Sequence, residues 1–239
     1  MALLRIDKIL SSQELASRKE IKALIKQGRI KADGKIVLKP EEKFDPESCE
    51  ITLDDKPILY KQFIYIMLNK PKGVVSASRD SRERTVLDLL PTELRRRDLF
   101  PAGRLDRNTE GLIIITDDGE FSHKLLAPKS HVNKLYEAVV DRKLTESDVE
   151  KFRAGISEGG DDFLPADMKL IGENTALVEI CEGKFHQVKR MFHAVGVEVL
   201  ELKRLRIGGL SLDKGLSLGE ARELSVKELE NALSREKIL

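Results

Sequence analysis

Tryptophan is absent from the 239-residue sequence, and cysteine is scarce, with two residues in the whole chain. Cys49 and Cys181 are far apart and form no Cys-x-x-Cys pattern, which argues against a disulfide framework and favours a reducing compartment. No apolar run approaches the ~20 residues needed to span a bilayer, and the apolar start of the chain is broken at once by Arg5. We therefore expect a soluble cytoplasmic protein with neither a signal peptide nor a membrane partner.

The signatures of metal and nucleotide cofactors are also missing. The four histidines show none of the short spacings that metal ligands have on a helix; they are His123, His131, His186 and His193. No glycine-rich loop follows an expected strand, which argues against an enzyme that uses a dinucleotide or S-adenosylmethionine. We therefore expect no metal and no cofactor.

The length and the charge distribution set the scale of the molecule. A chain of 239 residues makes one or two domains and can bury a core without disulfide or metal staples. Residues 1–35 contain nine Lys/Arg and four Asp/Glu, a net of +5, whereas residues 36–60 contain three and seven, a net of −4. Because the whole chain has a net charge of only +1, the basic end is a local footprint rather than a global field.

Residues 1–60 are predicted to form a compact basic module. A first helix is expected over residues 4–12. Ser17 and Glu20 have the spacing of a capping box that begins a second helix, and Gly28 is expected to end it.

Two turns are predicted in and after this module. Asp33-Gly34 is typical of a tight hairpin between short strands. We expect Asp54 to Pro57 to be the linker that leads to a second domain, residues 61–239.

The second domain shows strand-like and helix-like stretches without strict alternation, which favours an α+β fold. The expected strands are residues 63–68, 112–116, 136–140, 176–181 and 197–207, and the expected helices are residues 85–90, 120–127, 145–152, 184–195 and 225–233.

Five basic side chains cluster on the second expected helix and the turn after it: Arg18, Lys19, Lys22, Lys26 and Arg29. Such clusters neutralise RNA phosphates, although a solvated helix face explains the charges equally well. The layout of residues 3–50 resembles the small αL RNA-binding module found in a small-subunit ribosomal protein and in many RNA-modifying enzymes. The resemblance implies binding to structured RNA, and it implies no chemistry.

A second constellation is Gly103-Arg104-Leu105-Asp106, a polar and tightly turned stretch between apolar runs. Taken alone, Asp106 is better explained as a loop-closing or capping residue. With the Thr-Glu-Gly-Leu sequence that follows, however, the stretch closely resembles the central motif of pseudouridine synthases, in the branch that contains the bacterial 16S and 23S rRNA enzymes. Four more stretches resemble motifs of that family in the same order: residues 68–73, 134–136, 182–191 and 202–208.

This resemblance implies a fold and a reaction. The fold is an α+β catalytic domain with a long mixed, largely antiparallel sheet flanked by helices, joined to the αL module. The reaction breaks the N-glycosidic bond of a flipped-out uridine, turns the base and rejoins it through carbon 5, without a cofactor or metal. Asp106 is implied to be the nucleophile or base, and it must be ionised in that role.

Four more site residues follow from the resemblance. Lys189 is implied to be the counter-ion of Asp106, and helix geometry supports this because Lys189 lies beside the apolar stripe while Arg190 falls on the opposite face, towards solvent. Tyr136 resembles the tyrosine that packs against the target base, Arg104 the arginine that fills the space left by that base, and Leu205 the apolar floor of the pocket. Without the family, Lys189 has a surface lysine as its lesser alternative, whereas Tyr136 and Leu205 are explained equally well as core residues.

The sequence is therefore expected to encode a monomeric, site-specific enzyme that isomerises uridine to pseudouridine in ribosomal RNA, with 16S rRNA as the first choice of substrate. A 23S rRNA target is the alternative within the same class. A non-catalytic rRNA-binding or ribosome-assembly protein is the alternative from another class, although such a binder would not need Asp106, Tyr136 and Lys189 together. Whether the substrate is naked rRNA or an assembly intermediate stays open.

Overall fold

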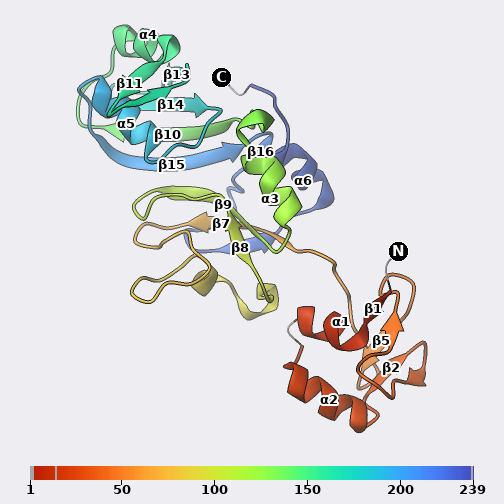
Figure 1. The fold of residues 1–239 in the computed structure, drawn as a ribbon. Helices are drawn as coiled ribbons and strands as arrows, with labels where there is room; N and C mark the ends of the chain where they lie inside the picture. The colour runs from red at the N-terminus through yellow and green to blue at the C-terminus, as the bar shows by residue number, and fades with distance from the viewer. Residues whose placement is uncertain (1–2, 14, 238) are drawn as a thin grey trace. The chain divides into compact units, whose positions relative to one another are not determined.

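The computed structural model describes residues 3–13, 15–237 and 239, and the chain forms two compact units (Figure 1). The N-terminal unit comprises Met1–Ile64 and Arg95–Leu99, and the large unit comprises Tyr65–Leu94 and Phe100–Leu239. No helix in the described ranges is long and apolar enough to cross a membrane.

The N-terminal unit packs two helices and short strands around an isoleucine-rich core. Its elements are β1 (Leu4–Arg5), α1 (Ile6–Ser12), α2 (Arg18–Lys26), β2 (Ile30–Ala32), β3 (Lys35–Ile36), β4 (Lys43–Phe44), β5 (Ile51–Leu53) and β6 (Lys56–Pro57). The strands β3-β2-β5-β6 form one sheet, and β1 pairs with β4. Ile9 of α1 and Ile21 of α2 are fully buried against this sheet's apolar residues, so packing supports two helices that are each too short to be stable alone.

Local signals in this unit are confirmed. The Ser17 hydroxyl accepts a hydrogen bond from the Glu20 N–H, and the Glu20 carboxylate accepts one from the Ser17 N–H, which completes the capping box. Asp33 and Gly34 have φ angles of 47° and 75° between β2 and β3. Two successive residues with positive φ are what a tight hairpin turn requires.

The expected linker at Asp54 to Pro57 is wrong. Asp54 and Asp55, with φ angles of 52° and 62°, form the turn of a second hairpin, in which β5 pairs with β6. Arg29 Nε donates to the Asp54 carboxylate at 2.7 Å, and Lys31 Nζ lies 2.6 Å from the Asp55 carboxylate. The two aspartates therefore close a turn and pair with cations of the same unit.

The large unit is built on a nine-stranded mixed sheet, as expected for an α+β fold. Its main path runs β13-β14-β10-β15-β9-β7-β17, while β16 pairs with β15 and β8 with β9. The strands are β7 (Tyr65–Lys70), β8 (Phe100–Ala102), β9 (Glu110–Thr116), β10 (Lys134–Val140), β13 (Asp167–Leu170), β14 (Thr175–Ile180), β15 (Val199–Ile207), β16 (Leu210–Ser211) and β17 (Ala221–Glu223), with β11 (Ile156–Glu158) and β12 (Asp161–Phe163) in a separate hairpin.

The sheet has a seam at its centre, where β9 and β15 run parallel and are in register at only two pairs of residues. One of these pairs is Arg204 with Gly111. Gly111 has a φ of 104°, and a Cβ atom there would lie 2.2 Å from the Arg204 carbonyl oxygen. Only glycine therefore permits this close approach of the two strands.

Helices cover the sheet and complete its core. They are α3 (Gly119–Leu126), α4 (Glu146–Ala154), α5 (Gln187–Ala194) and α6 (Val226–Ala232), with 3-10 turns at η1 (Leu87–Leu89), η2 (Thr92–Leu94) and η3 (Pro128–Ser130). Phe121 and Leu125 of α3 pack with Leu112 and Ile114 of β9, and Leu229 of α6 joins the same cluster. Figure 1 shows α3 and α6 near β16.

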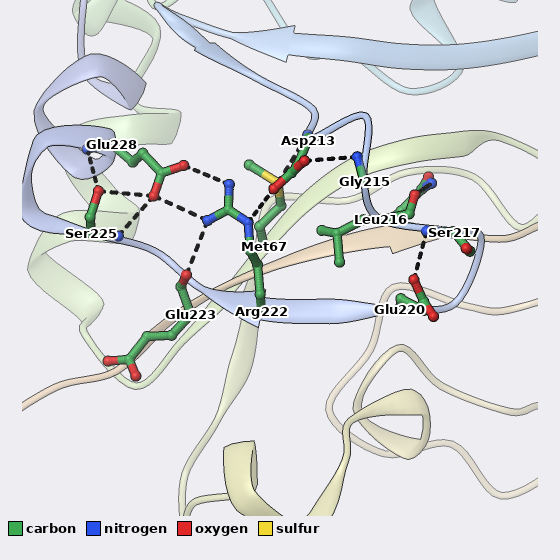
Figure 2. A network of polar contacts seen from close by, with 11 residues as sticks. Met67, Asp213, Gly215, Leu216, Ser217, Glu220, Arg222, Glu223, Ser225 and Glu228 are labelled. Carbon is green, nitrogen blue, oxygen red and sulfur yellow. Dashed lines mark hydrogen bonds and ion pairs between the residues drawn. The ribbon is translucent and has the colours of Figure 1, made fainter.

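A polar network near the C-terminus supports the end of β7 (Figure 2). Arg222 of β17 donates to Asp213 at 2.6 Å and to Glu228 of α6 at 2.7 Å, which ties three segments together. The loop between Asp213 and Arg222 bonds to Asn69, whose side chain donates to the Leu216 carbonyl at 2.8 Å. The C-terminal segment therefore holds the end of β7, which is the first part of the motif of residues 68–73.

Candidate active site

A cavity of about 840 Å³ opens within the large unit. Its walls come from the loop between β8 and β9, the segment after α3, strands β10 and β15, and the connection from β14 to α5. Asp106, Arg104, Tyr136 and Arg204 all line it. Segments separated by about a hundred positions in the sequence therefore meet at one concave site.

The backbone of the Asp106 loop is anchored by Lys70, the last residue of β7. The Lys70 side chain is fully buried, and its ammonium donates to the carbonyls of Pro71, Asp106, Arg107 and Thr109 at 2.9–3.2 Å. Burial lowers the pKa of Lys70 to about 8, although the Asp106 carboxylate opposes that shift.

Two further contacts hold the same loop. The Ser76 hydroxyl donates to the Leu105 carbonyl at 2.8 Å and accepts from the Leu105 N–H at 3.0 Å, and the Gly73 N–H donates to the Arg107 carbonyl at 2.8 Å. The segment of residues 68–76 therefore supports the Asp106 loop, through the side chains of Lys70 and Ser76 and the backbone of Gly73.

The Asp106 carboxylate, 28% exposed, faces two nitrogen-containing side chains from the start of α5. Lys189 Nζ lies 4.0 Å from Oδ2, and His186 Nε2 lies closer, 3.3 Å from Oδ1. The structure thus brings Lys189 to Asp106 as expected. His186 was considered only as a metal ligand in the sequence, where nothing indicates that the turn before α5 directs its ring towards Asp106.

Tyr136 is buried at 8% exposure on β10, with its phenol beside Arg204 of β15. Arg204 Nη1 donates to the Tyr136 hydroxyl at 3.4 Å, and Nε donates to the Leu112 carbonyl at 2.7 Å. Nη2 of Arg204 has no hydrogen-bond partner within the described residues. Sequence reasoning missed Arg204, because a buried arginine in a strand cannot be distinguished from a solvated one without knowing its neighbours.

Lys134, two residues before Tyr136, adds a second buried cation to the cavity wall. Its ammonium donates to the Val132 carbonyl at 2.8 Å, and burial lowers its pKa to about 8, with Arg204 contributing in the same direction. Two buried cations, Lys134 and Arg204, thus line the same cavity as the Asp106 carboxylate, and they suit a substrate on which negative charge develops.

The remaining expected residues separate into two groups. Arg104 lines the cavity with an exposed side chain. Leu205 does not line it, whereas Leu202 and Arg204 do so from the same strand. Leu205 is the extra residue of a register shift, since Arg204 pairs with Tyr136 and Arg206 with Leu135. The expectation that Arg190 faces solvent is wrong. Its guanidinium binds Glu158 and Asp161 of the β11–β12 hairpin at 3.0 and 2.7 Å.

The expected RNA-binding cations lie in the N-terminal unit. Four of the five are exposed side chains of α2: Arg18, Lys19, Lys22 and Lys26. Arg29 differs because its guanidinium is paired with Asp54. Across the described residues, no group of three or more His, Cys, Asp or Glu side chains is arranged to hold a metal ion.

Comparison with known proteins agrees with this geometry. The family described as RNA pseudouridylate synthase matches residues 64–194, and the S4 domain matches residues 4–48. An uncharacterised RNA pseudouridine synthase of Bacillus subtilis is 45% identical, with 95% of this chain and 97% of that protein covered. The ribosomal small subunit pseudouridine synthase A of Escherichia coli is 37% identical, with 95% and 98% covered. A crystal structure of a pseudouridylate synthase, 33% identical, superimposes with a TM-score of 0.68 over 96% of this chain and 99% of its own.

Proposed function

The chain belongs to the RNA pseudouridylate synthase family and carries an N-terminal S4 domain, and from this premise we propose that it isomerises a specific uridine in small-subunit ribosomal RNA, with Asp106 as the catalytic carboxylate. The observation that carries the proposal is the position of Asp106. Lys70 donates a hydrogen bond to the backbone carbonyl of Asp106, and the Asp106 carboxylate faces the cavity between the side chains of His186 and Lys189.

The reaction breaks the bond from ribose C1′ to uracil N1 and forms a bond from C1′ to uracil C5. The C5 hydrogen leaves to solvent as a proton, and N1 takes up a proton in its place. In this proposal the ionised Asp106 acts as nucleophile or base on the ribose. Lys189 acts as its counter-ion, because a partly buried carboxylate keeps its charge only with cationic or hydrogen-bonding partners. Tyr136 packs against the base, and Arg104 takes the place that the base leaves in the RNA.

Arg204 fits a further part of this chemistry. Negative charge develops on the uracil ring when the glycosidic bond breaks. A buried guanidinium that already holds the Tyr136 hydroxyl, and still has a donor without a partner, can stabilise a uracil oxygen at that moment. Leu205 as the floor of the pocket stays a prediction from the family resemblance, and Leu202 is the apolar residue of β15 that lines the cavity.

We assign residues 1–60 to RNA binding and residues 61–239 to catalysis. The exposed cations of α2 support the first assignment, since exposed Lys and Arg side chains are free to neutralise phosphates. Small-subunit rRNA is preferred as substrate because the E. coli relative named for the small subunit aligns with this chain over nearly its full length. A 23S rRNA target is the second candidate within the same reaction.

The test measures tritium release from 16S and 23S rRNA transcribed without modification and labelled at uridine C5. The unaltered protein should release tritium from 16S rRNA, and Asp106→Asn, which keeps shape but cannot be an anionic nucleophile or base, should release none while binding the RNA normally. Glu110→Gln is the control, because this nearby carboxylate has no bond or proton to transfer in the mechanism. Appreciable release by Asp106→Asn would refute the role of Asp106, and release from 23S rRNA alone would correct the substrate.

A further inference from the structure

The rim of the cavity carries an exposed aromatic side chain that the fold does not use. Phe185 is 70% exposed, although burying a phenylalanine side chain stabilises a protein by about 1.5–3 kcal/mol. It lies in the connection between β14 and α5, next to His186, which lines the cavity. Phe185 itself is not part of the cavity wall, so its ring lies outside the space that holds a flipped base.

The Phe185 ring is stacked on the His186 ring. The two ring centroids are 3.8 Å apart and the planes differ by 18°, which makes a nearly parallel pair. His186 in turn contacts the Asp106 carboxylate, with 3.3 Å between Nε2 and Oδ1. The two stacked rings therefore connect the Asp106 carboxylate with the protein surface.

The backbone holds this step in place. His186 has a φ of 50°, a left-handed conformation that is uncommon for a residue other than glycine and costs on the order of 1 kcal/mol. The loop is locked around it by the buried Gln187 side chain, which accepts from the Lys184 N–H at 3.1 Å and donates to Glu182 at 2.9 Å. Strain held by a rigid loop beside a catalytic group favours a functional reason for the ring positions.

We propose that Phe185 and His186 form a stacking platform for the unpaired RNA base next to the target uridine. This inference rests on the proposed function. When a uridine leaves its stack, the adjacent base loses a neighbour, and an exposed aromatic face at the cavity mouth replaces it. The substrate is then single-stranded or looped RNA around the target, and the contact tolerates any base because every base has a π-face.

The first measurement compares the RNA affinity of full-length variants at Phe185. Base-aromatic stacking contributes roughly 1–3 kcal/mol per base, so Phe185→Ala should weaken the affinity for 16S rRNA about 5- to 150-fold. Phe185→Leu should lose most of the affinity despite its apolar side chain, and Phe185→Trp should keep it. The salt dependence of binding should be unchanged, because no phosphate contact is removed. Val226→Ala is the control, since Val226 is similarly exposed, at 73%, on α6.

The second measurement tests the contact itself. After the target uridine is mapped, each adjacent nucleotide is replaced in turn by an abasic one. One of the two replacements should weaken binding to the unaltered protein as much as Phe185→Ala does, and should weaken binding to Phe185→Ala no further. Normal affinity of Phe185→Leu, or equal abasic losses in both proteins, would overturn the platform. Absence of tritium release by the unaltered protein would instead refute the proposed function, and Phe185→Leu would still test stacking through binding alone.

Discussion

Replacing Lys70 by methionine tests the support of the Asp106 loop without changing a residue that we propose takes part in the reaction. Lys70 itself does not line the cavity, yet its ammonium donates to four carbonyls, including that of Asp106. After the substitution, the Asp106 and Arg107 carbonyls keep backbone partners, the N–H groups of Thr109 and Gly73. The carbonyls of Pro71 and Thr109 lose their bond to the ammonium.

The magnitudes partly cancel. Each carbonyl left buried without its donor costs about 1–3 kcal/mol, or roughly 2–6 kcal/mol for the two. Against this, the shift of the Lys70 pKa from 10.5 to about 8 corresponds to a net cost of about 3 kcal/mol for keeping the ammonium charged in the folded protein, mainly through desolvation, and methionine does not incur it. The net loss in unfolding free energy at pH 7 should therefore lie between about −1 and 3 kcal/mol. The loss in kcat should be larger, at least about 100-fold, because a shift of roughly 1 Å in the Asp106 backbone displaces the carboxylate that we propose as the catalytic group.

Thermal unfolding followed by circular dichroism measures the first quantity, and tritium release measures the second. The stability difference between the two proteins should widen as pH rises from about 8 to 10.5, because folded Lys70 then loses its proton before unfolded Lys70 does and the desolvation cost disappears. Lys72→Met is the matched control, since the Lys72 ammonium is exposed and lies 3.4 Å from the exposed Glu201. A folded Lys70→Met protein with kcat within 3-fold of normal would refute the role of Lys70 as an anchor.

Three other perturbations have distinct expected outcomes. Lys189→Met should lower kcat at least about 10-fold and Lys189→Arg should restore part of it, because charge returns beside Asp106 in a different geometry; Arg190→Met should instead lower the melting temperature with kcat preserved, and the reverse pattern would exchange the two roles. Replacing the four exposed α2 cations with glutamine in the full chain should weaken rRNA binding. The slope of log K against log salt concentration should become shallower, by an amount equal to the loss of up to about four phosphate contacts. An unchanged slope would exclude α2 from the interface. The Arg142 ion pair, aided by the Thr145 hydroxyl, lowers the pKa of Asp148 from 3.8 to about 2, so its stabilisation is complete above pH 4 and is lost as pH falls towards 2; acid unfolding of Asp148→Asn should lack that part of the pH dependence.

The sequence predicted best those features that depend on adjacent residues. The capping box at Ser17 and the hairpin turn at Asp33 need contacts only within a few positions, and both formed as expected. Asp54 to Pro57 was taken for a linker because proline and charged residues are typical of one, whereas the pairing of β6 with β5 depends on the register of an edge strand.

The candidate site shows the same division. Asp106 and Lys189 were found through motifs, and the structure brings their side chains together. No role was predicted for His186 or Arg204, because their contacts join segments far apart in the sequence. His186 meets the Asp106 loop, and Arg204 meets Leu112 of β9, about 80 to 90 positions away. The solvent-facing assignment of Arg190 failed for a related reason, since helical periodicity cannot show that the hairpin of β11 and β12 covers that face.

The seam between β9 and β15 separates two groups of residues that line the candidate site. The loop with Asp106 leads into β9, on one side of the seam, while Tyr136 and Lys134 belong to β10, which pairs with β15 on the other. The two halves of the sheet therefore meet where Gly111 pairs with Arg204, and the close approach of β9 and β15 at this pair determines the distance between the two groups. A side chain at position 111 would collide with the Arg204 backbone and push the two strands apart. Gly111 therefore sets the width of the candidate active site from within the sheet.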